Sequence, residues 1–234
     1  MRFLASAKSV LDVVGHMATQ ISARRFSKFA NGSVRNPFGI AFDIDGVILL
    51  GENPIGGSPR VLQRLCELAV PFVFLTNGGG YRESDRALEL SRLLDVEISP
   101  LQVVQGHTPF KQLVNRYANE LVVAVGKGKP ATVMSDYGFK KVLSIDEYSS
   151  YFDGIDPLEK YKSWKSIHTA EGAVRQHKIH SQRVRAAFVV SDSVDWSRDI
   201  QVLCDILRTG GLPGREIGDQ PHLYFANDDM AYQM

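Results

Sequence analysis

Residues 38–42 read Phe-Gly-Ile-Ala-Phe and lead directly into Asp43-Ile44-Asp45-Gly46. The apolar run predicts a buried strand, and the glycine predicts a turn where that strand ends. Ligands of open α/β sheets bind beyond the carboxyl ends of the strands. Two carboxylates this close in sequence repel one another, so they imply a bound cation, a shared proton or divided chemical roles. The stretch therefore predicts a sheet with a functional site at its edge.

Residues 72–80 repeat this order of an apolar strand and a polar turn. Phe72-Val73-Phe74-Leu75 predicts a second buried strand, which ends at Thr76-Asn77-Gly78-Gly79-Gly80. A hydroxyl, an amide and backbone N–H groups without bulky side chains are suited to hold phosphate oxygens. Placed at the next strand end of the same sheet as the two carboxylates, this turn indicates a phosphate-binding site.

Strands and helices alternate along most of the chain, which predicts an α/β fold with a parallel sheet and right-handed crossovers. Residues 121–125 would be the third strand of that sheet. After Gly126 the pattern loosens, and residues 148–183 lack periodicity. Expected helices lie at 60–68, 82–94, 110–117, 131–137 and 196–207, and further strands at 141–143, 185–190 and 223–226.

The Asp-x-Asp-Gly element admits a structural and a chemical interpretation. Calcium binding in an EF-hand loop is not expected, because that loop needs a further ligand at its fifth position and glycine at its sixth, whereas Gly46 stands fourth and Val47 fifth. A purely structural turn remains open. In the chemical interpretation, Asp43 attacks phosphorus as a nucleophile, and Asp45 protonates the leaving group and then activates water. Magnesium bound by Asp43 and Asp45 would offset the repulsion between carboxylates and phosphate.

These motifs resemble those of the haloacid dehalogenase (HAD) superfamily of phosphohydrolases. Residues 42–47 match its first motif and Leu75-Thr76-Asn77 its second. The TNGGG turn and Gln105-Gly106-His107-Thr108-Pro109 are similar to subclass IIA, in its mitochondrial cat eye syndrome critical region protein 5-like branch. The resemblance implies Asp43 and Asp45 as catalytic residues and metal ligands, Thr76, Asn77 and Gly78 as phosphate ligands, and Mg²⁺ as cofactor. It also implies a Rossmann-like core with an inserted α/β cap, a small phosphorylated metabolite as substrate and a link to glycerophospholipid metabolism.

The chain also departs from that family. Family members return to the core after the cap with a lysine-bearing motif and a late acidic motif, whereas this sequence ends at Met234. We therefore expect a truncated chain, weakly active or inactive, whose first strand is left as an exposed apolar edge. A non-catalytic interaction or regulatory protein is the alternative. Gly126-Lys127-Gly128-Lys129-Pro130 stands before the expected cap, where a catalytic lysine is not expected.

The first 36 residues differ in composition from the rest of the chain. They hold six basic residues and one acid, Asp12, with apolar residues at roughly helical spacing and several serines. Such a segment is typical of a mitochondrial or plastid transit peptide. Arg24-Arg25-Phe26-Ser27 predicts cleavage after Phe26 and a mitochondrial location, with the matrix favoured over plastid or cytoplasm. A disordered basic tail and a membrane-associated amphipathic segment are the alternatives.

Composition excludes several other classes of function. A formal net charge of +1 gives the protein no strong overall electrostatic field that would attract nucleic acid. No apolar run reaches the length of a membrane helix. No acidic residue or cysteine stands at metal-ligand spacing near His168, His177 and His180. We expect a helix that is capped by, or carries on its surface, Asp192, Asp195 and Asp199.

We expect the chain to have three parts, namely a transit peptide at 1–36, the first half of the core at 37–145 and an incomplete cap at 146–234. The oligomeric state stays open.

Overall fold

The computed structural model describes residues 38–152, 154–156 and 181–227. The chain divides into two compact units between Pro109 and Phe110, and the described residues on either side of that point are called here the first and second units. The division differs from the boundary near residue 145 that the sequence predicted. The predictions for residues 1–36, His168, His177 and His180 fall outside the described residues.

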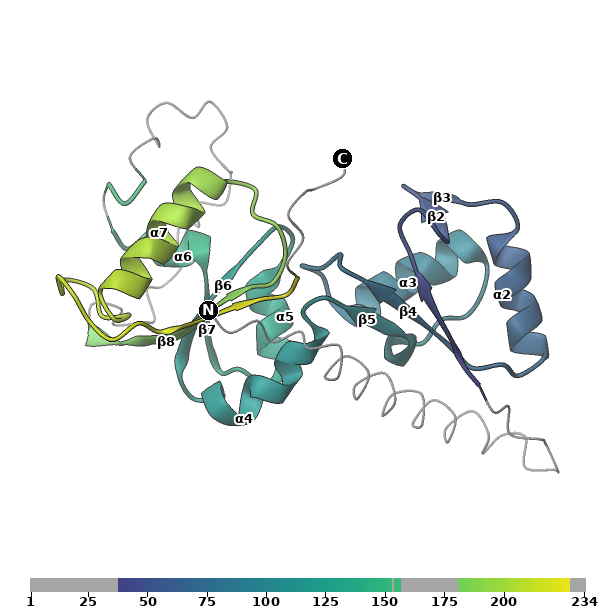
Figure 1. The fold of residues 1–234 in the computed structure, drawn as a ribbon, viewed down its shortest axis with the longest axis horizontal. Coiled ribbons are helices and arrows are strands. Elements are labelled where there is room, and N and C mark those ends of the chain that lie inside the picture. Colours follow the sequence, from purple (N-terminus) through teal and green to yellow (C-terminus); the bar gives the residue numbers. More distant parts are fainter. Residues whose placement is uncertain (1–37, 153, 157–180, 228–234) are drawn as a thin grey trace. The chain divides into compact units, whose positions relative to one another are not determined.

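The first unit contains a three-stranded parallel sheet in the order β1-β4-β5 (Figure 1). Strand β1 (Ile40–Asp43) pairs with β4 (Phe72–Thr76), which pairs with β5 (Val103–Gln105). The connections include α2 (Ser58–Glu67), α3 (Glu83–Leu94), the 3₁₀ helix η1 (Pro100–Gln102), and a short hairpin of β2 (Leu49–Leu50) and β3 (Asn53–Pro54). The third strand of this sheet is therefore β5, and residues 121–125 belong elsewhere.

Strand β1 lies at one edge of this sheet in the described part of the chain. Its residues alternate, with Ile40 and Phe42 partly buried against the core and Ala41 and Asp43 exposed. Phe42, Phe72 and Phe74 pack ring against ring, with centroids 5.7–6.4 Å apart. These ring contacts hold β1 on the sheet, and within the described residues no strand pairs with its other side.

The second unit contains a four-stranded parallel sheet in the order β7-β6-β8-β9. Its strands are β6 (Leu121–Val125), β7 (Lys141–Ser144), β8 (Val184–Val189) and β9 (His222–Phe225). Its helices are η2 (Thr108–Leu113), which spans the division, α4 (Val114–Tyr117), α5 (Pro130–Tyr137), α6 (Ile145–Ser149) and α7 (Trp196–Arg208). Residues 110–145, which the sequence assigned to the core, thus share a sheet with the residues assigned to the cap.

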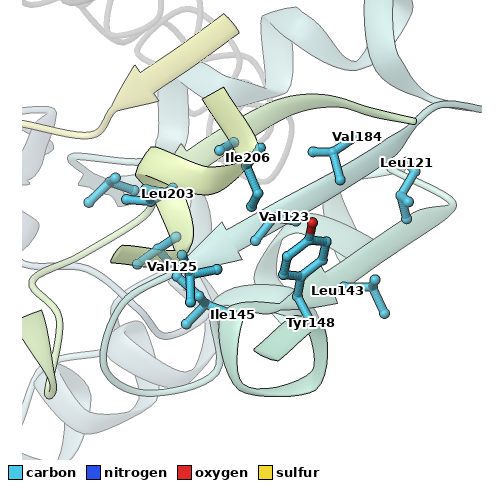
Figure 2. Packing of buried hydrophobic residues seen from close by; sticks show 12 residues of the cluster. Leu121, Val123, Val125, Leu143, Ile145, Tyr148, Val184, Leu203 and Ile206 are labelled. Carbon is cyan, nitrogen blue, oxygen red and sulfur yellow. The ribbon is translucent and has the colours of Figure 1, made fainter. Parts of the chain in front are cut away.

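The two faces of this second sheet bury different side chains. On one face, Val123 and Val125 of β6 pack with Val202 and Ile206 of α7, and α6 adds Tyr148 (Figure 2). On the other face, Phe188 is fully buried among aromatic rings from η2, α4, β9 and the turn after α5. Because every residue of β6 is buried, its sequence is continuously apolar, and that pattern cannot reveal which sheet it joins.

The predicted α/β class with parallel sheets is confirmed. Among the described residues, no helix is long and apolar enough to cross a membrane.

Candidate active site

The carboxyl end of β1 turns sharply through the Asp-x-Asp-Gly element. The Gly46 N–H donates to the carbonyl oxygen of Leu49 at 2.7 Å, and the Ile44 carbonyl accepts from the N–H groups of Ile48 and Leu49. Gly46 has φ +81°, a backbone conformation that disfavours other residues. Ile44 is fully buried in the core of the first unit. The buried isoleucine anchors the turn, while Asp43 and Asp45 on either side of it are exposed to solvent.

The turn after β4 lies beside this element because β1 and β4 run parallel in register. Asp43 is paired with Leu75, so the next residue of β4, Thr76, reaches the same sheet edge. The Thr76 hydroxyl lies 3.4 Å from Oδ2 of Asp45 and donates to it. The structure therefore brings the two predicted halves of the site together, as the sequence indicated.

Thr76 also organises the loop that follows it. Its side chain is largely buried, and its Oγ1 accepts a hydrogen bond from the Gly78 N–H at 3.0 Å. A Cβ at Gly78 would lie 3.2 Å from that oxygen, which is closer than most real contacts. Asn77 and Gly78 are both exposed. The loop thus presents an amide side chain and main chain to solvent next to the two carboxylates.

Residues of β5 and of the turn after it form hydrogen bonds that hold this loop in place. Gln105 donates from Nε2 to the carbonyl oxygen of Tyr81 at 2.9 Å. Thr108 accepts from the Gln105 N–H at 2.9 Å and donates to the carboxylate of Glu83 at 3.0 Å. Glu83 is buried in the first turn of α3, where a negative charge is favoured by the helix dipole. The Gln105–Pro109 motif therefore fixes the start of α3 and the loop that precedes it.

A cation that the sequence did not predict also faces the site. Arg86 of α3 places Nη2 3.8 Å from Oδ1 of Asp45 and donates from Nη1 to Glu89 at 2.7 Å. Its position ten residues beyond Thr76 carries no motif. Only the packing of α3 against the sheet brings the guanidinium back to the turn after β1, so no pattern in the sequence could have identified it.

The donor set suits a hard divalent cation. Asp43 and Asp45 supply exposed carboxylate oxygens, and Mg²⁺ is commonly held by one or two carboxylates together with substrate phosphate oxygens. In the described ranges there is no cluster of three or more His, Cys, Asp or Glu side chains that could hold a metal by itself. The residues present therefore fit an ion that is completed by other oxygens, and they do not form a closed protein cage.

Other sequence candidates lie in the second unit and have structural roles. The Gly126–Lys129 loop follows β6, and the Lys127 N–H donates to the carbonyl oxygen of Asp192 at 2.7 Å. Asp195 is the N-cap of α7, as expected for a helix-capping residue. Asp199 is buried and accepts from Arg198 at 2.7 and 2.9 Å and from Ser193. Burial raises the pKa of Asp199, although the hydrogen bonds from Ser193 and Arg198 oppose that shift.

Comparisons with known proteins agree with the motif pair. Residues 40–140 match the family model of the haloacid dehalogenase-like hydrolases. The chain is 34% identical over 198 residues to the mitochondrial hydrolase YKR070W of Saccharomyces cerevisiae, covering 82% of this chain and 55% of that protein. It is 28% identical over 228 residues to a cardiolipin synthase (CMP-forming)/mitochondrial hydrolase fusion protein of Schizosaccharomyces pombe, covering 92% of this chain and 37% of that protein. The chain therefore spans about half or less of the length of these relatives.

Solved structures show the same fold. A 4-nitrophenylphosphatase of Thermotoga maritima aligns with a TM-score of 0.52 at 18% identity, covering 82% of this chain and 55% of that one. The glycerol phosphate phosphatase Rv1692 of Mycobacterium tuberculosis, solved in complex with magnesium, aligns with a TM-score of 0.50 at 16% identity. That alignment covers 82% of this chain and 44% of the Mycobacterium protein. At these identities the likeness establishes the fold.

Proposed function

The chain belongs to the haloacid dehalogenase-like superfamily, and on that basis we propose that it hydrolyses small phosphoric monoesters through Asp43. One observation carries the proposal. The exposed carboxylate of Asp43 stands at the carboxyl end of β1, and the Thr76–Gly78 loop stands at the carboxyl end of the neighbouring strand β4. The proposed nucleophile and the proposed anion-binding loop therefore lie at the ends of adjacent strands. A structural turn alone would not need both features at the same place.

The proposed reaction proceeds in two displacements. In the first, a carboxylate oxygen of Asp43 attacks phosphorus, the bond to the ester oxygen breaks, and Asp45 gives its proton to the departing alkoxide. In the second, Asp45 takes a proton from water, whose oxygen attacks phosphorus. The bond to Asp43 then breaks, which releases inorganic phosphate and restores both side chains. The Thr76–Gly78 loop holds the phosphate oxygens during both steps.

Magnesium belongs to the same proposal, with Asp43 and Asp45 as its protein ligands. When bound, it would supply positive charge against the repulsion between the carboxylates and the phosphate. The exposed oxygens of both side chains and the superfamily relative solved with magnesium support this assignment.

Location and substrate class are also proposals. Both curated relatives are named mitochondrial hydrolases, which supports a mitochondrial location, and the matrix is the compartment we propose. The relative fused to cardiolipin synthase supports a phosphorylated substrate linked to glycerophospholipid metabolism. The Mycobacterium structure, named a glycerol phosphate phosphatase, is consistent with such a small substrate.

Phosphate release from p-nitrophenyl phosphate in the presence of Mg²⁺ tests the proposed activity. We expect Asp43→Asn to lower the rate at least a hundredfold, because the amide cannot act as the nucleophile. Asp85→Asn is the matched control, since Asp85 is an exposed carboxylate of α3 in the same unit and should leave the rate unchanged. Hydrolysis that is insensitive to Asp43→Asn, or absent from the wild type, would contradict the proposal.

The alternative, an interaction or regulatory protein, is favoured by the open edge of β1 in the described part of the chain. A magnesium titration by calorimetry separates the two functions. Saturable binding that Asp43→Asn abolishes supports the hydrolase. Absence of any Asp43-dependent binding supports the interaction protein.

A further inference from the structure

The Asp45 carboxylate is held at both of its oxygens. Oδ2 faces the hydroxyl of Thr76 at 3.4 Å, and Oδ1 faces Nη2 of Arg86 at 3.8 Å. These partners come from different elements, β4 and α3, and approach the carboxylate separately. A carboxylate with 65% of its side chain exposed would otherwise be free to rotate. The two contacts therefore define one preferred orientation of a group that the solvent alone does not constrain.

Arg86 is itself fixed in place. Its side chain is only 21% exposed, and Nη1 donates to Oε2 of Glu89 one turn further along α3 at 2.7 Å. The guanidinium is planar, so a hydrogen bond at one terminal nitrogen also sets the direction of the other. Glu89 thus aims Nη2 of Arg86 toward Asp45. A flexible surface arginine would not provide such a fixed positive charge.

The Thr76 hydroxyl lies at the long end of the hydrogen-bond range from Oδ2 of Asp45, and Arg86 forms with Oδ1 an ion pair that is longer than a hydrogen bond. Hydrogen bonds of catalytic groups are often long in the absence of substrate and shorten when the substrate is bound. This inference rests on the proposed function, in which Asp45 passes its proton to the leaving group. A guanidinium beside Oδ1 restricts rotation of the Asp45 carboxyl group and keeps Oδ2 on the side of the Thr76–Gly78 loop, where the proposed function places the phosphate.

We propose that Arg86 is a positioning residue that orients Asp45 for proton transfer to the leaving group. Removing the guanidinium then weakens protonation of the leaving group and leaves the nucleophile, Asp43, unaffected. A poor leaving group depends on that proton more than a good one does. The loss should therefore be larger for phenyl phosphate than for p-nitrophenyl phosphate, two aryl esters of similar size.

The experiment compares kcat/KM and KM of the full chain and its variants for these two esters with Mg²⁺. For Arg86→Gln we expect kcat/KM to fall about tenfold for phenyl phosphate and about threefold or less for p-nitrophenyl phosphate, a part of the 10²–10⁴ that a general acid contributes. KM should change less than twofold. Arg86→Lys keeps the charge but cannot engage Glu89 and Asp45 with separate fixed nitrogens, so it should lose less than Arg86→Gln.

Arg64→Gln is the matched control. Arg64 belongs to α2 in the same unit and makes an i,i+3 pair with Glu67 at 2.7 Å, just as Arg86 does with Glu89, but Arg64 is mostly exposed. We expect it to leave both substrates unaffected. In the background of Asp45→Asn, Arg86→Gln should cause no further loss, because the two residues act on one step.

Each outcome of this comparison either supports or overturns the positioning role of Arg86. An equal loss for both esters, an unchanged Arg86→Gln, or a further loss in the Asp45→Asn background would overturn the positioning role while leaving the hydrolase intact. A wild type without Asp43-dependent release would refute the proposed function, and this inference with it. If Arg86→Gln does not fold, as judged by circular dichroism, Arg86→Lys is compared with wild type instead. A larger loss of kcat/KM for phenyl phosphate than for p-nitrophenyl phosphate then supports the positioning role, and an equal loss overturns it.

Discussion

Replacing Phe188 with alanine tests which residues form the core of the second unit. Phe188 is fully buried in β8, and its ring centroid lies 5.1 Å from that of Phe110, 5.3 Å from Phe139 and 5.0 Å from Tyr224. Deleting a buried phenylalanine side chain usually costs about 3–5 kcal/mol. The surrounding rings belong to several elements and cannot all move into the cavity. We therefore expect about 4 kcal/mol for Phe188→Ala and less than about 1.5 kcal/mol for Phe188→Leu, which keeps most of the volume.

Hydrogen exchange followed by mass spectrometry measures this loss of stability separately for each unit. A loss of about 4 kcal/mol corresponds to about a thousandfold faster exchange for amides that are released only by unfolding of the unit. We expect that change in residues 121–125 of β6 and little change in residues 72–76 of β4, because the two strands belong to different sheets. Phe74→Ala, which truncates a buried ring of the first unit, should give the opposite result.

One result would refute this reasoning. If β6 belonged to the sheet of β1 and β4, as the sequence predicted, Phe188→Ala would release residues 72–76 together with 121–125. Equal protection of β6 in Phe188→Ala and wild type would likewise show that the ring cluster does not stabilise that sheet. Phe188→Leu extends the test to conditions under which the alanine variant is already unfolded.

Two further predictions concern stability in the second unit. Gly126→Ala should lower the free energy of unfolding by about 3 kcal/mol in urea titrations, because Gly126 has φ +139° and a Cβ would lie 2.7 Å from the carbonyl oxygen of Ser191; a wild-type midpoint would contradict this close approach. Burial raises the pKa of the Asp199 carboxyl above its ordinary value of 3.8. The protonated carboxyl therefore stabilises the folded state fully below pH 3.8, and this contribution is lost as the pH rises through the folded-state pKa. The stability of wild type relative to Asp199→Asn should therefore be higher at pH 3 than at pH 7, and the opposite trend would contradict the pKa direction.

Local features of the site were predictable because their physical causes are local in sequence. Gly46 provides the positive φ of the turn, and the alternation of β1 leaves Asp43 exposed at its end. The pairing of this turn with Thr76 also followed from the sequence, since two consecutive apolar strands joined by a helix become parallel neighbours. The role of the Gln105–Pro109 turn in supporting the loop required the structure, because its partners, Tyr81 and Glu83, lie more than twenty residues away.

The sequence by itself determined the α/β class, and it predicted the candidate site at the end of the first strand and the similarity to the haloacid dehalogenase-like superfamily. The tertiary structure decided that β6 joins the second sheet, because a strand that is buried on both faces carries no pattern specifying its neighbours. It also placed Arg86 beside Asp45, a contact that depends on how α3 packs and not on spacing along the chain. Residue patterns encode local geometry and burial, whereas the partners of a buried strand or a long side chain are set only when distant elements pack together.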